Sequence, residues 1–373
     1  MLKTIISFLL SHIPTTKIIA FNSFPDYTDN AYAMFAYLYK NGYTKRYKMV
    51  WLINNKNKIK YIRKQVNAEG FQCLVVGKMT IRGLWFFVRS RYCFYTHGIL
   101  NSIPLKQHTN KMINLWHGMP LKVIGLKDNR TELYTNIDCY ISTSEPFLKI
   151  LSECFGVSEK HGVEVGQPRC DLLFEETDFY EKKGIDRCQF DKIGIWLPTY
   201  RYSIVETEKR VDGEFNSGFI SFLDENGLSR LDKDLQSLRQ LLIIKLHPMD
   251  KSQLYNFRHY NNIIIIKQKD FDSQLYPLLG STDYLLTDFS SVCIDYDILK
   301  KPMAFVINDY DSFAKTRGFL FDDVLSLLPG PIIDKYEDLI AFMENPYYTP
   351  PKMEFNKYSD NNASKRLAEF LEL

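Results

Sequence analysis

Short apolar runs alternate with amphipathic stretches along most of this chain, and this alternation restricts the fold more than any other feature. Apolar runs bounded by turn residues are typical of buried strands, while apolar residues that recur every three or four positions are typical of helices. Strands that alternate with helices pair in parallel, because each parallel crossover needs a connection of helix length. The sequence therefore predicts an α/β fold built from doubly wound, Rossmann-like sheets.

The alternation occurs twice. The predicted strands cover residues 17–21, 47–53, 71–76, 92–95, 112–116 and 138–142, and then 193–197, 241–246, 263–266, 284–286 and 303–306. The predicted helices cover residues 29–39, 56–68, 80–88, 145–154, 231–239, 272–279, 292–299, 336–343 and 363–373. Because a chain of 373 residues exceeds what one core usually holds, and a polar stretch at 175–192 interrupts the pattern, we expect two domains. They are residues 1–180 and 190–360, facing a central cleft, with residues 361–373 as a helix that packs back on the first domain.

Charge is distributed unevenly between the two parts. Residues 1–130 contain 20 Lys and Arg against 4 Asp and Glu, whereas the rest of the chain contains 27 against 40. A basic half indicates a polyanionic partner such as anionic lipid, nucleic acid or a phosphorylated polymer. The aromatic residues among these cations fall at strand and helix spacings, so core packing explains them better than nucleic-acid binding does. The seven cysteines form no C-x-x-C pair, which fits a reducing compartment.

Two histidines follow predicted strands, where parallel sheets bind ligands. His117 lies in Trp116-His117-Gly118, and an imidazole there is suited to act as a general base at neutral pH. His247 precedes Pro248 at the end of the strand at 241–246. Either histidine alone is more often structural than catalytic.

Hydroxyl and guanidinium groups in the second part form a candidate phosphate site. Ser290 and Ser291 precede the predicted helix at 292–299, and free backbone N–H groups at a helix start bind anions. Thr287 and Asp288 precede them, and Arg201 and Arg317 offer planar forks that match phosphate oxygens.

No nucleotide-binding glycine loop of either common type occurs, which argues against P-loop NTPases and dinucleotide-dependent dehydrogenases. Four D-x-D strings start at Asp232, Asp270, Asp295 and Asp309, and such strings are weak metal signals. We expect no metal held by the protein and no bound cofactor, and leave a divalent cation such as Mg²⁺ open.

These segments together resemble the CDP-glycerol glycerophosphotransferase family, the teichoic-acid primases and polymerases. The resemblance spans residues 21–331, and its segments, in order, are Asn22-Ser23-Phe24, Asp29-Asn30, Trp116-His117-Gly118-Met119-Pro120-Leu121-Lys122, Gly166-Gln167-Pro168-Arg169-Cys170-Asp171, Pro198-Thr199-Tyr200-Arg201, His247-Pro248, Thr287-Asp288-Phe289-Ser290-Ser291, Asp295-Tyr296, Arg317-Gly318-Phe319 and Pro329-Gly330-Pro331. The chain has Met119, Cys170 and Phe289 where the family often has Thr, Asn and Tyr.

The resemblance implies a GT-B type fold and transfer of a glycerol-phosphate unit from CDP-glycerol to an acceptor hydroxyl, with release of CMP. It implies His117 and His247 as catalytic residues, with His117 as the base. The implied donor-binding residues are Thr199, Arg201, His247, Thr287, Asp288, Ser290, Ser291, Arg317 and Gly318, and the implied acceptor-binding residues are Asn30, Gly118 and Lys122. The implied acceptor is lipid-linked or a polyol phosphate, in the synthesis of a teichoic-acid-like or capsular polymer. A CDP-ribitol phosphotransferase and a CMP-sugar-dependent glycosyltransferase are the alternatives.

The resemblance also implies a peripheral protein on the cytoplasmic face of the cell membrane. Residues 1–13 would be the amphipathic segment, and the anionic inner surface would be the partner, with no nucleic acid. Because stable attachment normally takes two signals, basic patches with Lys56, Lys64, Arg82 and Arg89 would have to contribute. No run of apolar residues is long enough to cross a bilayer, and no signal-peptide cleavage site follows the first apolar run, so we expect neither a membrane span nor secretion.

Overall fold

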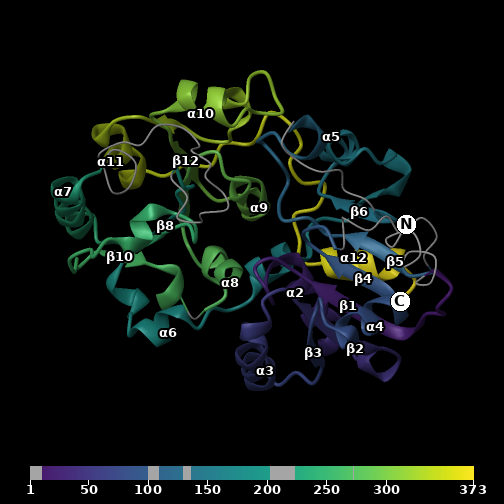
Figure 1. Cartoon of the computed structure of the whole chain (residues 1–373). Helices are drawn as coiled ribbons and strands as arrows, with labels where there is room; N and C mark the ends of the chain where they lie inside the picture. Colours follow the sequence, from purple (N-terminus) through teal and green to yellow (C-terminus); the bar gives the residue numbers. More distant parts are fainter. Residues whose placement is uncertain (1–10, 100–108, 129–135, 202–222, 272) are drawn as a thin grey trace. The chain divides into compact units, whose positions relative to one another are not determined.

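The computed structural model describes residues 11–99, 109–128, 136–201, 223–271 and 273–373 (Figure 1). Most of the amphipathic segment predicted at residues 1–13 lies outside these residues. No helix in the described ranges combines the length and apolar character that crossing a membrane requires.

The chain divides into two compact units that do not follow one another simply in sequence. Unit 1 comprises Met1–Met119, Ile124–Leu172 and Lys357–Leu373, and unit 2 comprises Pro120–Val123 and Leu173–Asn356. The peptide directly after the Trp116-His117-Gly118 segment therefore belongs to unit 2, and the C-terminal segment belongs to unit 1.

Unit 1 contains one parallel sheet. Its strands are β1 (Thr16–Asn22), β2 (Lys48–Ile53), β3 (Leu74–Gly77), β4 (Ser90–Tyr95), β5 (Lys111–Asn114), β6 (Cys139–Ser142) and β7 (Gly162–Glu164). Their order is β3-β2-β1-β4-β5-β6-β7, and every adjacent pair is parallel. The helices of unit 1 are α2 (Asp29–Lys40), α3 (Ile59–Ala68), α4 (Ile81–Arg89), α5 (Glu145–Phe155) and α12 (Ala363–Phe370).

Residues that alternate along the central strands of unit 1 explain why helices cover both faces of its sheet. The ring of Phe21 on β1 lies 5.3 Å from that of Phe35 on α2, and Trp51 on β2 lies 5.6 Å from the same ring. The neighbouring residue Ala20 belongs instead to a buried cluster with Phe87 on α4. Because successive side chains of a strand point to opposite faces, α2 and α4 pack on opposite faces of the sheet.

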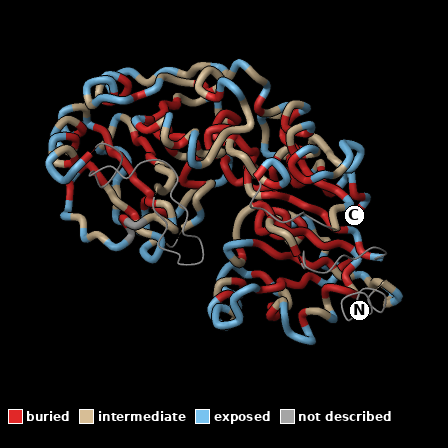
Figure 2. The backbone as a smooth tube through the Cα atoms, turned by 45° about the horizontal axis from the view of Figure 1, so that its top comes forward, coloured by how far each residue is buried: buried red, intermediate tan, exposed pale blue. Residues whose placement is uncertain are grey.

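Unit 2 contains a second parallel sheet. Its strands are β8 (Lys192–Trp196), β9 (Gln240–Lys245), β10 (Ile263–Ile266), β11 (Tyr284–Thr287), β12 (Met303–Val306) and β13 (Ile332–Ile333), in the order β10-β9-β8-β11-β12-β13. The helices are α6 (Phe179–Lys183), α7 (Glu225–Ser237), α8 (Leu275–Gly280), α9 (Val292–Tyr296), α10 (Tyr310–Thr316) and α11 (Tyr336–Glu344). Most residues of the central strands of both sheets are buried, as Figure 2 shows, whereas the edge strands β7, β10 and β13 are partly exposed. The predicted α/β class with two parallel sheets is confirmed.

Several elements differ from the prediction, among them α10 and β13, which were not expected, and four others that differ for local reasons. Part of the polar stretch expected to be a linker folds as α6, because Phe179 and Tyr180 are buried. Helix α7 starts six residues before the predicted 231, because the side chain of Asp224 caps it by accepting a hydrogen bond from the backbone N–H of Gly227. Helix α9 is shorter than expected and continues as a 3-10 turn, Asp297–Leu299. Strand β7 was not expected, because three residues are too few for a periodicity signal.

The C-terminal helix α12 is attached to unit 1 by a carboxylate. Asp171 accepts hydrogen bonds from the backbone N–H groups of Ala363 and Ser364 at 2.8 and 2.9 Å, which satisfies the start of the helix. Arg366 further along donates to the carbonyl of Val165 at 3.0 Å. These contacts, together with packing of α12 on α2, hold the end of the chain within unit 1.

Candidate functional site

The sheet of unit 1 has its topological switch point between β1 and β4. The chain runs outward from β1 through β2 to β3 on one side, and then returns to β4 and continues to β7 on the other. Ligands of open parallel sheets bind beyond the carboxyl ends of the strands at such a point. The segments after β4 and β5, which begin at Thr96 and Leu115, both lie at this edge.

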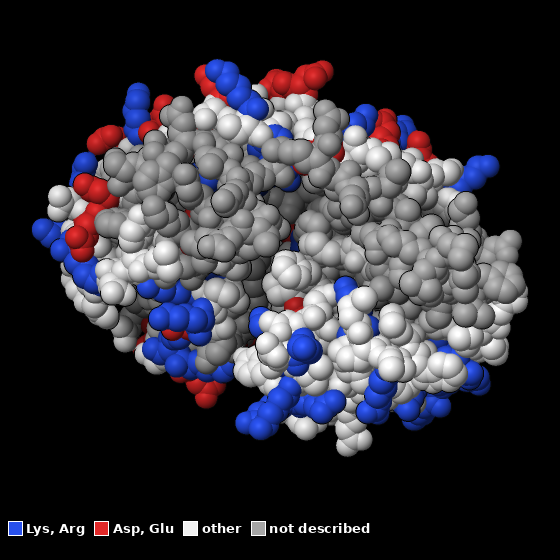
Figure 3. Space-filling model, in the orientation of Figure 1, with Lys and Arg blue, Asp and Glu red and all other residues white. Residues whose placement is uncertain are grey.

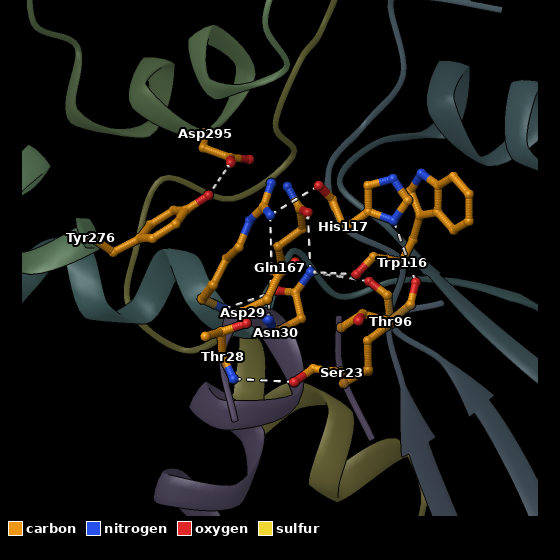
Figure 4. Close-up of polar contacts among 12 residues, drawn as sticks. Ser23, Thr28, Asp29, Asn30, Thr96, Trp116, His117, Gln167, Tyr276 and Asp295 are labelled. Carbon is orange, nitrogen blue, oxygen red and sulfur yellow. Dashed lines mark hydrogen bonds and ion pairs between the residues drawn. The ribbon is translucent and has the colours of Figure 1, made fainter. Parts of the chain in front are cut away.

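His117 lies in the segment after β5 and is half-buried. Its Nδ1 atom lies 3.4 Å from the backbone oxygen of Thr96, a contact drawn in Figure 4. Because a carbonyl oxygen only accepts, His117 donates from Nδ1, and its basic lone pair is then on Nε2. The ring of Trp116 lies 4.0 Å from the imidazole and fixes one side of it.

Asn30 and Arg169 hold the backbone of the His117 segment by hydrogen bonds to its carbonyl oxygens. The Asn30 amide donates to the carbonyls of Leu115 and Trp116, both at 3.1 Å, and its oxygen accepts from the backbone N–H of Arg169 at 3.0 Å (Figure 4). The guanidinium of Arg169 joins the Asp29 carboxylate at 2.8 Å to the backbone oxygen of His117 at 3.0 Å. This network fixes the direction in which His117 leaves the sheet.

The structure corrects the role expected for Asn30. Its side chain is completely buried and its amide is used by the protein, so it does not offer atoms to an acceptor. The backbone that it holds is unusual: Trp116 has φ of 49° and Gly118 has φ of 131°. A non-glycine residue in the left-handed region costs free energy, and the hydrogen bonds from Asn30 offset that cost.

In unit 2, Arg201 is held by two carboxylates. Its Nε and Nη2 atoms donate to Asp309 at 2.6 and 3.0 Å, and its Nη1 atom donates to Asp288 at 3.0 Å and to the Thr199 hydroxyl at 2.6 Å. Thr199 also donates to Asp288 at 2.7 Å. Most of the guanidinium fork is therefore engaged within the protein. The sequence predicts that Arg201 and Thr199 bind donor phosphates directly. In the structure Arg201 instead binds Asp288 and Asp309, because two neighbouring carboxylates need a cation, and Thr199 binds Asp288.

His247 follows β9 and is neutral in the ordinary pH range. Burial, followed by the positive charges of Lys122 and Lys245, lowers the pKa of His247 to about 3. Its Nδ1 atom accepts from the backbone N–H of Met249 at 3.2 Å, so its hydrogen is on Nε2. In this state His247 is a neutral hydrogen-bond donor, and the ring of Tyr200 packs against it at 4.8 Å.

Lys245 is a buried cation that the sequence pattern did not single out. Its ammonium donates to the amide oxygen of Gln268 at 3.2 Å and lies 4.9 Å from the ring of Phe271. Burial lowers the pKa of Lys245 to about 8. The signal that could have identified it is a lysine at the end of an otherwise apolar strand, two residues before His247.

Lys122 is placed by the structure in unit 2, although it was expected to serve an acceptor held by the first domain. Residues Pro120–Val123 pair with the segment after α10: the backbone N–H of Val123 donates to the carbonyl of Gly318 at 3.2 Å, and Lys122 forms an antiparallel bridge with Phe319. Gly318 has φ of 75° and lies against Val123. The Lys122 ammonium lies 5.2 Å from the ring of Phe313, and Arg201 lies 4.9 Å from the same ring.

The predicted phosphate site after β11 is smaller than expected. Thr287 is completely buried and donates to the carbonyl of Leu197 at 2.9 Å, so it ties β11 to β8 and does not face a ligand. Ser290 and Ser291 are half-buried, but α9, which follows them, has only five residues. Arg317 is half-buried and ends α10.

Within the described residues, no three His, Cys, Asp or Glu side chains converge in the way that a metal site requires. The first aspartate of three of the four D-x-D strings has an internal partner. Asp232 accepts from the backbone N–H of Asn262 at 2.7 Å, Asp295 accepts from the hydroxyl of Tyr276 at 2.6 Å, and Asp309 binds Arg201.

The histidine of unit 1 that sequence reasoning missed is His97, which follows β4. Its ring is stacked on that of His117, with centroids 4.1 Å apart and planes 6° apart. The signal was present, because Thr96-His97-Gly98 repeats the His-Gly pattern that singled out His117.

Three comparisons with known proteins agree with the predicted resemblance. The family model described as "CDP-Glycerol:Poly(glycerophosphate) glycerophosphotransferase" matches residues 5–373. The chain is 30% identical over 298 residues to the teichoic acid glycerol-phosphate primase of Bacillus subtilis (strain 168), which covers 74% of this chain and 71% of the primase. It is 26% identical over 400 residues to the teichoic acid glycerol-phosphate transferase of Staphylococcus aureus (strain NCTC 8325 / PS 47), which covers 97% of this chain and 94% of that protein.

Among solved structures, a wall teichoic acid polymerase TagF with CDPG matches with a TM-score of 0.75 at 20% identity, covering 99% of this chain and 93% of that chain. This likeness concerns the fold. The chain spans 43 to 50% of the length of several polymerase relatives.

Replacing Asn30 with alanine should disturb the His117 segment without disturbing unit 2. Asn30→Ala removes the donor of two buried carbonyls and the acceptor of one buried N–H, and should lower the free energy of unfolding of unit 1 by about 2–4 kcal/mol. Urea unfolding followed by far-UV circular dichroism measures the loss. The control Asn67→Ala, at an exposed position of α3, should cost less than about 0.5 kcal/mol. Equal losses for the two variants would contradict the supporting role of Asn30.

Proposed function

Since this chain belongs to the CDP-glycerol:poly(glycerophosphate) glycerophosphotransferase family, we propose that it transfers glycerol phosphate from CDP-glycerol to a hydroxyl of a lipid-linked or polyol-phosphate acceptor, releasing CMP. The product is a teichoic-acid-like or capsular polymer of the cell surface. The two matched relatives, whose names specify glycerol-phosphate primase and transferase activities, support glycerol as the polyol.

The observation that carries the catalytic part of this proposal is the hydrogen bond from His117 Nδ1 to the Thr96 carbonyl. It leaves the Nε2 lone pair of His117 to accept a proton, which is the state that a general base requires. A nearby carboxylate is not needed to set this tautomer, because the carbonyl does so.

In the proposed reaction, the acceptor hydroxyl loses its proton to His117 Nε2 as its oxygen attacks the β-phosphorus of CDP-glycerol. The new O–P bond forms while the bond from the β-phosphorus to the bridging oxygen breaks, and CMP leaves with that electron pair. Phosphoryl transfer of this kind depends on alignment and on neutralisation of charge more than on covalent chemistry.

The donor diphosphate is assigned to unit 2. His247 would donate from Nε2 to a phosphate oxygen, and Lys122 and Arg317 would supply positive charge. The hydroxyls of Ser290 and Ser291 are half-buried and serve as additional donors. Arg201 keeps Asp288 and Asp309 paired, so that two carboxylates do not repel the diphosphate.

Transfer assays with the purified chain test the proposal. Wild-type protein should release CMP from CDP-glycerol in the presence of acceptor, and mass spectrometry should find glycerol phosphate added to it. Because a general base contributes about 10²- to 10⁴-fold in rate, His117→Ala should lower kcat by that factor while leaving the KM for CDP-glycerol unchanged. Wild-type turnover by His117→Ala would show that His117 is not the base.

The same assay separates the related donors and acceptors. Several relatives bear the names of ribitol-phosphate polymerases, at 24 to 26% identity, so CDP-ribitol is the comparison donor. A higher kcat/KM for CDP-ribitol would replace glycerol with ribitol in the proposal. Transfer of a sugar without phosphorus would contradict the whole reaction class.

We propose that the reaction uses no metal held by the protein, because Asp295 and Asp309 are engaged by Tyr276 and Arg201. A divalent cation would then enter only with the diphosphate. Dialysis of the protein against EDTA, followed by assay in metal-free buffer with added Mg²⁺, should restore the full rate at once. A loss of activity that Mg²⁺ does not reverse, accompanied by a metal found in the untreated protein, would contradict this part.

We also propose that the protein binds the cytoplasmic face of the membrane through α3 and α4. Met79, Ile81 and Trp85 are large apolar residues at 68, 90 and 52% exposure on or just before α4. The exposed cations of the same region are Lys56, Lys58, Lys60, Arg63, Lys64 and Arg82. Figure 3 displays Lys and Arg gathered over α3 and α4 with few acidic groups between them.

A pocket of about 200 Å³ between α3, β3 and α4 is lined by Arg63 and Arg82. It would hold a lipid phosphate while the apolar side chains enter the interface. Apolar contact and several cations together supply the two signals that stable attachment requires.

Substitutions on α4 test the membrane surface. Ile81→Asp combined with Trp85→Asp should lower binding to vesicles of phosphatidylglycerol and phosphatidylcholine at least about tenfold in a sedimentation assay. The reason is that the two substitutions remove apolar contact and reduce the net positive charge of this surface. Leu254→Asp combined with Tyr347→Asp, at two exposed apolar positions of unit 2, is the charge-matched control and should bind as wild type does. Undiminished binding by the α4 variant would place the membrane surface elsewhere.

A further inference from the structure

Two adjacent strands of the first sheet end in the same short motif. Strand β4 runs into Thr96-His97-Gly98 and β5 runs into Trp116-His117-Gly118, and β4 and β5 pair in parallel. The two histidines therefore leave the same edge of the sheet side by side. The proposed reaction gives a role to His117 and none to His97.

The two imidazoles form a parallel stack that one residue orients. The ring centroids are 4.1 Å apart and the planes differ by 6°. His117 Nδ1 lies 3.4 Å from the backbone oxygen of Thr96, and His97 Nδ1 lies 3.1 Å from the Thr96 hydroxyl oxygen. Because both Nδ1 atoms face Thr96, both Nε2 atoms lie on the side of their rings away from it.

The partners of Thr96 fix the tautomer of His117 and allow the opposite tautomer for His97. The Thr96 carbonyl accepts from His117 Nδ1, which leaves a lone pair on His117 Nε2. Its hydroxyl oxygen accepts from the backbone N–H of Phe24 at 3.2 Å and lies 3.1 Å from His97 Nδ1, where a hydroxyl can either donate or accept. When the hydroxyl donates, His97 carries its hydrogen on Nε2, and this is the tautomer that the proposal below requires.

The surroundings of the stack keep His97 neutral. Burial lowers the pKa of His97, the charge of Lys78 acts in the same direction, and that of Asp29 opposes them. The Asp29 carboxylate is bound by Arg169 at 2.8 Å, and the ring of Phe24 packs against His97 at 5.5 Å. A neutral ring beside His117 does not repel the positive charge that His117 acquires when it takes a proton.

We propose that His97 and His117 together form the binding site for the acceptor hydroxyl, in which His97 Nε2–H donates to the hydroxyl oxygen and His117 Nε2 accepts the hydroxyl proton. This inference rests on the proposed phosphotransferase function and adds to it a second residue that touches the acceptor.

The pair acts on one oxygen atom during the transfer. As the O–H bond breaks, the proton goes to His117 Nε2, and the electron pair of the oxygen forms the new bond to the β-phosphorus. The hydrogen bond from His97 stabilises the negative charge that develops on this oxygen before the bond to phosphorus is complete. His97 itself neither gains nor loses a proton.

Two substitutions separate hydrogen bonding from stacking. His97→Phe keeps an aromatic face on His117 but removes the donor, and should lower kcat/KM for the acceptor about 10- to 100-fold with the KM for CDP-glycerol unchanged within about twofold. His97→Gln keeps an N–H donor and should stay within about fivefold of wild type. His161→Phe, at an exposed histidine of unit 1, is the matched control and should leave kcat/KM unchanged. Circular dichroism confirms that each variant is folded.

A measurement that needs no turnover separates the failure of this inference from that of the proposed function. Long-range ¹H–¹⁵N correlation spectra of ¹⁵N-histidine protein, assigned with the His97→Gln and His117→Ala variants, report each tautomer directly. We expect Nδ1–H for His117 and Nε2–H for His97.

Other tautomers, or full acceptor kcat/KM in His97→Phe, would overturn the two-histidine site even if wild-type protein transfers glycerol phosphate. Absence of any transfer by wild type, with the expected tautomers present, would instead contradict the phosphotransferase assignment.

Discussion

The buried amide of Asn30 is the contact on which the arrangement of unit 1 depends. It bridges the carbonyls of Leu115 and Trp116 to the backbone N–H of Arg169, and so joins helix α2 to two loops that are far apart in sequence. A buried amide must satisfy its hydrogen-bonding groups, so this geometry tolerates little variation. The left-handed backbone at Trp116, and through it the direction of His117, follows from this constraint.

A comparable constraint organises unit 2, where it concerns charge. Asp288 and Asp309 are nearly buried, and Arg201 pairs with both. Because unpaired buried charges cost several kcal/mol, this guanidinium is committed to the protein in the structure described here. The groups of unit 2 suited to contact an anion are then neutral His247 and Lys122, which lies in the segment Pro120–Val123. This segment follows directly after the His117 segment, so one continuous piece of chain contributes to both units.

The strands and most helices could be predicted because their signals are local. The apolar run at 263–266 coincides with β10, and the run at 303–306 coincides with β12. The exceptions are also local: β7 and β13 are too short for a pattern, and α6 depends on burial of Phe179 and Tyr180 in an otherwise polar stretch. The location of candidate site residues after strands could be predicted equally well, since the carboxyl ends of parallel strands lie at one edge of the sheet.

The partners of the site residues were not readable, because they come from distant parts of the chain. Asn30 carries the polar amide expected of a ligand-binding residue, and only its burial beneath residues 115 and 116 reveals that its partner is backbone. Arg201 has the fork that suits phosphate, and only the approach of Asp309, 108 positions away, engages it. His97 gained its importance from the pairing of β4 with β5, which stacks its ring on His117.

The amino-acid sequence by itself determined that the chain forms two parallel α/β sheets, that its first third is basic, and that histidines and hydroxyls follow particular strands. Periodicity and the order of motifs carry that information within short windows. Only the tertiary structure decided which polar groups are satisfied internally and which are left to act on a ligand. The physical reason is that hydrogen bonds and ion pairs depend on distances of a few ångströms, whereas the sequence separates Asn30 from its backbone partners, and Arg201 from its carboxylate partners, by 85 to 139 positions.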